Sequence, residues 1–503
     1  MFITKAKSLY GMISGDKRFD IVLIFLLCLF VVIVGYVWRS IELRPPHWDM
    51  GRHLYNSVIY LNHFKAGELS QLAADYRYYP PFIYWIAIPY YLAFGLSVKT
   101  AILSNSFLIL VLGFSVYGLG SRLWGRRVGL LSAVLILCSP MLVTQFKEFQ
   151  LDAPATAMVA LSMYLIIRTE EFKNRGWSLA LGIVLGLTML TKWTLGFILI
   201  LPISYAVLRG LMDAWKTKNL QPIFNMLIAF LSAYFIASFW YLQNFGQIRY
   251  DLITNGSTAG ANEGDPVVGT YASNVWYSLN LANSQLYLIP FALFLTGLVF
   301  MFKNLRKYFT RNIYPILLII GTLFFFTMLR NKDARYTLPM LVGVVIIATY
   351  WVGLIARGLY GNIISLLIVA YCIITFWIIS FGSALLPQQI KWGEVNIFAQ
   401  RGYIIGPPTK EDWRQSDIFL KISQQPGAKK LYTVYSPEEM YFNSWGNKYF
   451  SEIKGITIVD DLEKANYIIT SKNNELNQDK KFTIISEYSL PNGTTIYLLK
   501  RVE

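Results

Sequence analysis

The feature that most constrains this chain is a long series of apolar segments, because a helix needs about 20 apolar residues to cross a hydrocarbon core of roughly 30 Å. Hydrophobic residues make up 55% of the 503 residues and charged residues only 15%, which indicates a polytopic membrane protein. The apolar runs are Asp20–Trp38, Thr100–Gly120, Val128–Phe146, Ala153–Ile167, Trp177–Thr191, Trp193–Leu208, Pro222–Leu242, Leu286–Phe302, Ile313–Leu329, Tyr336–Ala356 and Ile363–Leu385. We therefore expect a polytopic α-helical protein with about 11 transmembrane helices, the first of them retained rather than cleaved.

The basic loops predict the orientation of these spans. A further apolar segment, Phe82–Leu96, is short, aromatic and interrupted by Pro89, and we place it on the outer side as an interfacial or re-entrant helix. The inner segments then hold 18 Lys and Arg against 5 Asp and Glu. The positive-inside rule places them, with the N-terminus, in the cytoplasm. Because the net charge of +16 is gathered in these short loops, it needs no nucleic acid partner.

Two domains are expected. Residues 1–385 form the membrane module, with long outer loops at 39–99 and 244–284, and residues 386–503 have the composition of a small extracytoplasmic α/β domain. An odd number of spans places this domain on the outer side. Its expected strands are Lys430–Tyr435, Ile456–Val459, Tyr467–Thr470, Phe482–Glu487 and Thr494–Leu499, with helices at Pro437–Phe442 and Asp461–Ala465. Pro491-Asn492-Gly493 predicts a hairpin turn between the last two strands.

Charged residues gather where spans end on the outer side. Asp49 follows the first span, Glu148 and Asp152 lie between two later spans, and Lys192 sits in a break with no room for a long loop. A third short outer turn contains Arg330, Lys332, Asp333 and Arg335. Ionisable groups are costly near lipid, so their recurrence at one membrane depth indicates a site.

Such a mixture suits transfer of a sugar from a polyprenyl phosphate to a hydroxyl. A carboxylate takes the proton of the acceptor, and cations stabilise the charge on the departing phosphate. Structural roles stand beside this interpretation, since Asp49 and Asp152 are also placed to cap helices and Lys192 to snorkel toward water. His47, His53 and His63 lie in the first outer segment, but no carboxylate spacing completes a metal site, and we predict none.

Several short motifs carry a resemblance to a known family. They are Trp48-Asp49, Tyr79-Pro80-Pro81, Trp124-Gly125-Arg126-Arg127, Leu151-Asp152-Ala153-Pro154, Leu190-Thr191-Lys192 and Ala334-Arg335-Tyr336-Thr337-Leu338-Pro339. In this order, over about the first 340 residues, they resemble the polyprenyl-phosphate-dependent GT-C glycosyltransferases that include bacterial aminoarabinose transferases and protein O-mannosyltransferases. After Leu385 the resemblance is only to the type of domain, a small soluble one, and not to sequence motifs.

The resemblance implies an inverting glycosyltransferase of a plasma membrane. Asp49 would be the catalytic base and Asp152 a second acid that orders a substrate. The donor phosphate would be bound by Lys192, Arg335 and Lys332, and the substrate pocket would include Trp48, Arg52, His53, Tyr79 and Glu148. Two positions depart from the family pattern: Met50 stands where many relatives have a second acid, and Tyr79 where they often have Lys or His.

The implied partners are a polyprenyl-phosphate-linked sugar, an acceptor on a lipid, glycan or protein, and the membrane lipids. No cofactor is predicted with certainty, and the sequence does not decide metal dependence, the sugar or the acceptor. Other classes remain open: a transporter or lipid flippase, which predicts inverted repeats that we do not find, and a noncatalytic envelope assembly protein. Within the enzyme class, a polysaccharide polymerase or ligase is a nearer neighbour.

Overall fold

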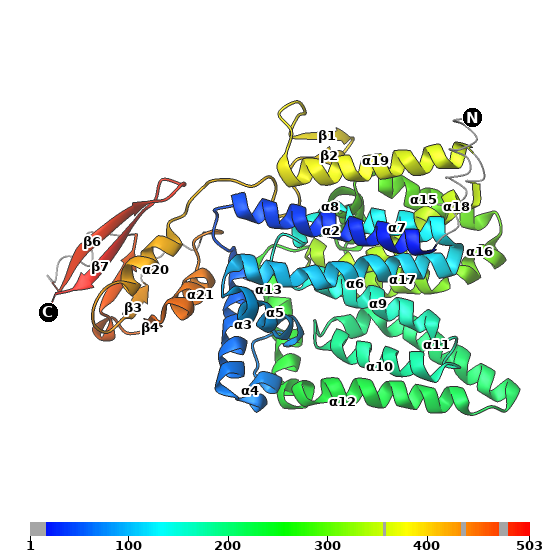
Figure 1. The fold of residues 1–503 in the computed structure, drawn as a ribbon, viewed down its shortest axis with the longest axis horizontal. Helices are drawn as coiled ribbons and strands as arrows, with labels where there is room; N and C mark the ends of the chain where they lie inside the picture. Colours follow the sequence, from blue (N-terminus) through cyan, green and yellow to red (C-terminus); the bar gives the residue numbers. More distant parts are fainter. Residues whose placement is uncertain (1–16, 356–358, 434–438, 472–480, 503) are drawn as a thin grey trace.

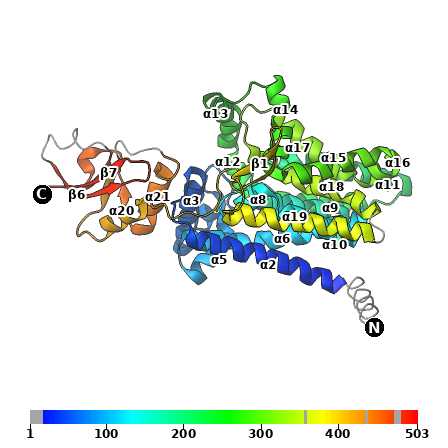
Figure 2. The same cartoon turned by 90° about the horizontal axis from the view of Figure 1, so that it is seen from above.

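The protein consists of a helical bundle with a small sheet unit beyond one end (Figure 1). A computed structural model describes residues 17–355, 359–433, 439–471 and 481–502. The long helices of the bundle run side by side, and the shorter helix α3 (Trp48–Ala66) runs across their end, between the bundle and the sheet unit (Figure 1). The turned view in Figure 2 shows the same separation of the two parts.

Six helices among the described residues are long and apolar enough to cross a membrane, and a seventh arises if the bent pair α16–α17 is one span. The six are α2 (Lys17–Ile41), α6 (Val98–Trp124), α11 (Leu195–Thr217), α12 (Gln221–Tyr250), η3–α18 (Ala334–Met340 and Leu341–Ile355) and α19 (Leu359–Phe381). The bent pair is α16 (Leu305–Arg311) and α17 (Ile313–Thr327), which meet at 69°. Shorter helices complete the bundle: α7 (Arg126–Leu137), α8 (Pro140–Gln145), α9 (Asp152–Arg168), α10 (Arg175–Met189) and α15 (Leu288–Phe302).

The helical membrane class expected from the sequence is confirmed. Each of the eleven apolar runs coincides with one of these helices or with a consecutive pair such as α7–α8. The number of spans stays a prediction, because several of the helices are too short to meet the length criterion alone. The doubtful segment Phe82–Leu96 forms helix α5 (Phe82–Phe94), whose 13 residues extend only about 20 Å. That length fits an interfacial position better than a crossing.

The helices of the bundle pack at close range through small residues. A Cβ atom on Gly182 of α10 would lie 2.3 Å from the carbonyl oxygen of Ala229 in α12, and one on Gly297 of α15 would lie 2.0 Å from that of Ile347 in α18. Such contacts allow backbones to approach where lipid supplies no hydrophobic driving force. Helix α18 is the centre of the bundle, since all ten residues from Leu341 to Tyr350 are buried.

The outer segments contain short helices rather than open loops. The first holds α3, α4 (Leu69–Ala74) and α5. The second continues α12 and then forms η1 (Asp251–Asn255), α13 (Gly256–Asn262), α14 (Tyr271–Asn280) and η2 (Leu281–Leu286). Helix α3 follows the stiff Pro45-Pro46 pair and ends at Gly67, which has the left-handed φ of 72° that glycine adopts without strain.

The C-terminal region has two parts. An antiparallel hairpin, β1 (Gln389–Trp392) with β2 (Val395–Ala399), packs on the bundle, where the Tyr371 hydroxyl of α19 donates to the Ile397 carbonyl at 2.7 Å. A five-stranded sheet follows, in the order β4-β3-β5-β7-β6. Its strands are β3 (Lys430–Thr433), β4 (Thr457–Ile458), β5 (Tyr467–Thr470), β6 (Phe482–Ser489) and β7 (Thr495–Arg501). Strands β4, β3 and β5 are parallel, and β7 and β6 add to β5 antiparallel.

The expected strands and the turn at Pro491-Asn492-Gly493 are therefore present, although residues 434 and 435 lie outside the described residues. The helix predicted at Pro437–Phe442 is wrong where it is described, because Glu439 and Phe442 close a tight turn through a β-bridge. The helix predicted at Asp461–Ala465 is only the 3₁₀ turn η4 (Leu462–Lys464). The real helices are α20 (Gln415–Ser423) and α21 (Ser444–Lys454). The domain boundary at residue 385 stays a prediction.

The sheet unit docks on α3 through α21. A Cβ atom on Gly51 of α3 would lie 3.2 Å from the Cβ of Trp445 and 3.1 Å from the Gly446 nitrogen. The Trp48 indole donates to the Glu439 carbonyl at 3.0 Å, and the Asn443 amide donates to the Pro46 carbonyl at 3.3 Å. The end of the bundle that carries α3 is therefore covered by the sheet unit.

Candidate functional site

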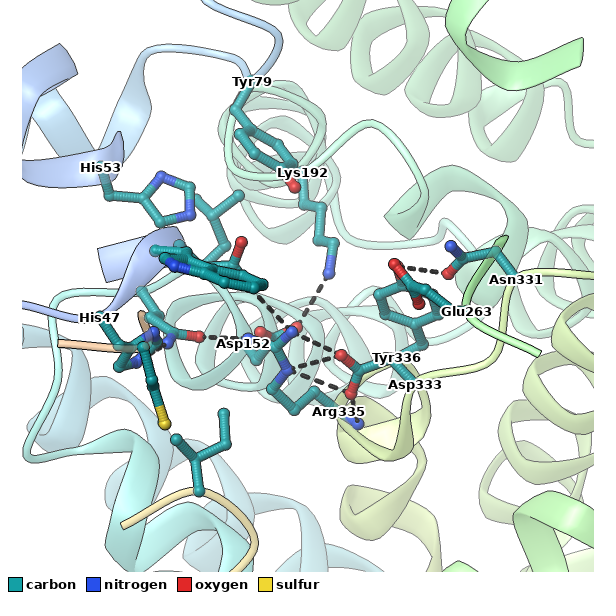
Figure 3. A pocket seen from close by; sticks show the side chains of 16 residues that line it. His47, His53, Tyr79, Asp152, Lys192, Glu263, Asn331, Asp333, Arg335 and Tyr336 are labelled. Carbon is teal, nitrogen blue, oxygen red and sulfur yellow. Dashed lines mark hydrogen bonds and ion pairs between the residues drawn. The ribbon is translucent and has the colours of Figure 1, made fainter. Parts of the chain in front are cut away.

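A cavity of about 470 Å³ lies at this end of the bundle. Its walls come from the first turn of α3, the start of α9, the break between α10 and α11, the turn before η3, and the turn at Glu439–Phe442. The side chains around it are largely ionisable or aromatic (Figure 3). The lining residues are His47, Trp48, Asp49, His53, Tyr79, Gln150, Leu151, Asp152, Lys192, Glu263, Asn331, Asp333, Arg335, Tyr336, Ile404 and Met440.

Asp49 lies in the first turn of α3 with its carboxylate open to the cavity. Its side chain is 50% exposed, and one oxygen lies 2.9 Å from Arg335 Nη2. Burial of the group would raise its pKa, but the Arg335 guanidinium outweighs that effect and holds the pKa of Asp49 at about 2. Asp49 is therefore a carboxylate at neutral pH.

The Arg335 guanidinium is held by Asp333 and Gln150 in addition to Asp49. Asp333 accepts from Arg335 Nε at 2.9 Å and from Nη2 at 2.5 Å, and it also caps the backbone of η3 by accepting from the Arg335 amide at 2.8 Å. Gln150 Oε1 accepts from Nη1 at 2.7 Å. This planar fork is fixed in direction, so the edge that faces Asp49 is positioned rather than free to rotate.

Lys192 and Asp152 form a second pair across the cavity. Lys192 Nζ lies 2.8 Å from Asp152 Oδ1, both side chains are largely buried, and the ammonium points toward the carboxylate in Figure 3. Asp152 is in the first turn of α9, where the helix dipole favours an anion. Lys192 occupies the break between α10 and α11, so its side chain enters the cavity without a long loop.

Glu148 lies behind the cavity, not in its wall. Its carboxylate is buried 2.8 Å from His47 Nε2 and accepts from Gln150 Nε2 at 3.3 Å. Gln150 Nε2 also lies 2.8 Å from His47 Nε2. Glu148 thus reaches the cavity through His47 and through Gln150, the residue that binds Arg335.

Three aromatic or imidazole groups line the cavity, and two of them, His53 and Tyr79, lie beside α5. His53 is buried, with Nδ1 2.9 Å from the Tyr84 hydroxyl, and burial lowers the pKa of His53 to about 3, so its ring is neutral. Tyr79 packs 5.0 Å from the His53 ring, and burial raises the pKa of Tyr79 well above its ordinary value. Trp48 is at the rim. These groups shape the cavity without adding charge.

Besides Glu148, two further residues predicted for the site do not line the cavity. Arg52 does not line the cavity, because its guanidinium lies over the rings of Tyr78, at 4.5 Å, and Trp445, at 4.9 Å. Lys332 turns away from the cavity and donates to the carbonyls of Phe326, Thr327 and Leu329 at the end of α17, at 3.0, 2.9 and 2.5 Å. It caps a helix.

The cavity also contains residues that were not selected from the sequence. They are His47, Gln150, Leu151, Glu263, Asn331, Asp333, Tyr336, Ile404 and Met440. Asp333 stood in the charged outer turn already noted, and Gln150 stood between Glu148 and Asp152. Glu263, Ile404 and Met440 come from distant segments and carry no local signal.

A second cavity of about 490 Å³ adjoins the first. The two share Tyr79, Lys192, Asn331 and Tyr336. Its other walls are mainly apolar and include Val267, Val268, Phe326 and Leu329. Lys192 therefore stands where a polar cavity meets an apolar one.

No group of three His, Cys, Asp or Glu that could hold a metal ion occurs within the described ranges. Cys28, Cys138 and Cys372 are buried and unbonded to one another.

Known proteins resemble this chain in sequence and in fold. Residues 79–241 match the family model described as dolichyl-phosphate-mannose-protein mannosyltransferase. ArnT from Cupriavidus metallidurans in the apo state is 15% identical with a TM-score of 0.60, covering 95% of this chain and 97% of that one. This chain has the GT-C fold of the ArnT and protein mannosyltransferase type.

Two further structures agree with the GT-C fold. ArnT from the same organism, bound to undecaprenyl phosphate, is 15% identical with a TM-score of 0.58 and covers 96% of this chain and 98% of that one. The oligosaccharyltransferase of Archaeoglobus fulgidus in the apo form is 10% identical with a TM-score of 0.52, covering 90% and 65%. No curated protein sequence matches the chain. The family model and the GT-C fold together indicate a multi-pass membrane glycosyltransferase.

Proposed function

We propose that this protein transfers a sugar from a polyprenyl phosphate to an acceptor hydroxyl on the outer face of the membrane, with inversion at the anomeric carbon and with Asp49 as the base. One observation carries the proposal: Lys192 lines both a cavity of acids and cations and an adjoining apolar cavity. A lipid-linked sugar phosphate needs both environments, joined at a cation.

The donor fits this arrangement from tail to sugar. The first isoprene units lie in the apolar cavity beside Val268 and Leu329, the phosphate meets Lys192, and the sugar enters the polar cavity. That the similarly folded ArnT has been solved with undecaprenyl phosphate supports a donor of this class. Arg335 also lines the polar cavity, and its guanidinium is a second cation for the phosphate.

The transfer proceeds in one displacement. The acceptor oxygen attacks the anomeric carbon as the bond from that carbon to the phosphate oxygen breaks. Asp49 takes the acceptor proton, and the polyprenyl phosphate leaves with the electron pair of the broken bond. Lys192 and Arg335 stabilise the charge that develops on the phosphate, which is where preorganised cations contribute most. Because Met50 follows Asp49, the base has no acidic neighbour in the sequence, and the other acids of the cavity, such as Asp333, come from other segments.

The ion pair with Arg335 makes Asp49 a weak base before substrate binds. A base with a pKa of about 2 takes a proton poorly at neutral pH. When a donor phosphate engages Arg335, the guanidinium is shared between two anions, and the pKa of Asp49 rises toward the operating pH. Donor binding thereby activates the base.

Asp152 serves as a positioning acid in this scheme. Its bond to Lys192 holds the ammonium at the junction of the two cavities. Removing the carboxylate leaves the ammonium mispositioned rather than removing a proton acceptor, so its loss affects donor binding first.

The proposal is tested by sugar transfer from a labelled polyprenyl-phosphate donor pool in membranes that contain the full chain. We expect Asp49→Asn to reduce transfer by at least about a hundredfold at equal expression. Asp412→Asn, an exposed carboxylate before α20, is the matched control and retains activity. Equal transfer by Asp49→Asn and the intact chain would exclude Asp49 as the base.

A further inference from the structure

A groove between α2 and α6 on the outside of the bundle shares no lining residue with the two cavities of the site. The two helices lie side by side in both views (Figures 1 and 2). Its floor and walls are apolar and include Val31, Val32, Ile102, Leu103 and Ile109. It holds only about 20 Å³ of enclosed free volume, so a ligand lies along it rather than inside the protein.

The groove belongs to the face of the bundle that meets lipid. On α2, the side chains of Leu29, Ile33 and Tyr36 are 39%, 52% and 50% exposed, and Phe107 of α6 is 49% exposed. Large apolar side chains left uncovered on a membrane-spanning helix face hydrocarbon. Gly35 deepens the groove, because a Cβ atom there would meet only the Phe146 carbonyl oxygen, at 3.9 Å.

Two cations stand at one end of the groove. Arg39 is in the last turn of α2 and Lys99 in the first turn of α6, at the end of the bundle that carries α3. Neither forms an ion pair with a carboxylate of the described residues. Arg39 donates two long hydrogen bonds, at 3.4 Å, to the Arg44 carbonyl, and it feels Glu42 and Glu148 only from beyond ion-pair distance. Lys99 is exposed without a hydrogen-bond partner in the described part of the chain.

Three other cations at this end, Arg44, Lys192 and Arg335, each have a carboxylate within 3 Å. Lys332 is instead held by three carbonyls, and buried Lys147 lies over the Trp38 ring. Lys99 also stands at a helix N-terminus, where the helix dipole disfavours a positive charge. An anion placed between Arg39 and Lys99 would neutralise both cations and interact favourably with the dipole at the N-terminus of α6.

We infer that this groove binds an anionic glycerophospholipid, with its phosphate between Arg39 and Lys99 and one acyl chain along the apolar floor. The charge selects an anionic headgroup, and the shallow apolar floor offers a surface for one acyl chain. The site is independent of sugar transfer, so its failure and that of the proposed function are distinguishable.

The test is native mass spectrometry of the delipidated full chain titrated with phosphatidylglycerol and, separately, with phosphatidylcholine. Each cation near a membrane surface contributes about 1 kcal/mol, so Arg39→Gln with Lys99→Gln weakens phosphatidylglycerol binding about thirtyfold. Lys65→Gln with Lys421→Gln, two exposed lysines away from the groove, is the matched control and binds as the intact chain does. Phosphatidylcholine binds weakly to all three.

A second variant keeps the inference testable if loss of both cations impairs folding. Gly35→Leu fills the groove and leaves Arg39 and Lys99 in place, and it also reduces phosphatidylglycerol binding about tenfold or more. Unchanged binding in either variant overturns the inference. Polyprenyl phosphate that displaces bound phosphatidylglycerol at equal concentration assigns the groove to the donor lipid and also overturns it.

Discussion

The ion pair between Asp49 and Arg335 is the residue-scale feature with the clearest consequence for pH. Asp49 has a lowered pKa of about 2, so it is deprotonated above that pH and loses its charge only as the pH falls through it. The intact protein is therefore expected to show no acid limb from Asp49 in its kcat/KM profile at about pH 5 to 8.

Arg335→Gln removes the guanidinium, so nothing on Arg335 opposes the effect of burial, which raises the pKa of Asp49. The pKa of Asp49 then rises, and the acid limb of kcat/KM moves up by about 1–3 pH units. Lys192→Gln is the comparison, because it removes a cation of the same cavity that does not contact Asp49. Lys192→Gln should lower kcat/KM without shifting the pH of its acid limb. An equal shift in both variants would mean that the net charge of the cavity, not the ion pair, sets the pKa of Asp49.

Lys332 has a structural role that the sequence did not reveal. Because its ammonium donates to three carbonyls at the end of α17, Lys332→Met leaves those groups unpaired and lowers stability by about 3 kcal/mol. The KM for the donor is expected to stay within about twofold. A thermal unfolding curve in detergent and a donor titration measure the two quantities, and a large rise in KM without loss of stability would restore a phosphate-binding role.

The sequence alone predicted several of the residues that line the cavity. Asp49, Asp152, Lys192 and Arg335 stand out because each is an ionisable group at the end of an apolar run, and all four line the cavity. Charge alone could not separate Lys332, a helix cap, from Arg335, since both lie in the same turn. Their catalytic roles stay predictions.

At the scale of elements, the sequence predicted the long helices and most strands of the sheet. Hydrophobic periodicity and Pro-Asn-Gly turn chemistry carry strong local signals. Helix α21 was missed because its buried face mixes Gly446, Asn447 and Ser451 with the aromatic Tyr449 and Phe450, so no aliphatic repeat marks it. That face is defined by packing on α3 and on α20, where Phe450 stacks on Phe419. Tertiary contact, not propensity, fixes this element.

The α3–α21 contact also affects the position of Asp49 in the site. Gly51 lies two residues from Asp49, and a side chain there would press on Trp445 and Gly446. Gly51→Val is expected to push α21 from α3, at an overpacking cost of about 1–3 kcal/mol, and to reduce sugar transfer about tenfold or more. Gly246→Val in α12 is the control, because no atom lies within 4 Å of a Cβ at that position.

Transfer rates and limited proteolysis of the two glycine variants give the readout. Gly51→Val should be cleaved faster than the intact chain in the link between the β1–β2 hairpin and α20, and Gly246→Val should not. Normal transfer by Gly51→Val would show that the sheet unit is not needed to hold Asp49 in place.

At the scale of the whole molecule, the sheet unit and helix α3, whose first turn contains Asp49, lie at the same end of the bundle, and α16 lies toward the other end (Figure 1). The three cysteines are buried, which leaves a low background for labelling introduced thiols. Lys421 in α20 and Lys307 in α16 are both exposed. They can therefore report on which side of the membrane each end lies.

An odd number of spans and the positive-inside rule predict that the sheet unit is extracytoplasmic. In intact cells, Lys421→Cys should react with a membrane-impermeant maleimide, whereas Lys307→Cys should react only after permeabilisation. The unsubstituted chain, with Cys28, Cys138 and Cys372 alone, should stay unlabelled. Labelling of both variants in intact cells would require an even number of crossings between α16 and α20, where α17, η3–α18 and α19 are expected to make three. The bent pair α16–α17 is then the first to reconsider. Labelling of Lys307→Cys alone would mean that the sheet unit is cytoplasmic: either α5 crosses the membrane and Asp49 stays outside, or the whole molecule is inverted and Asp49 is cytoplasmic.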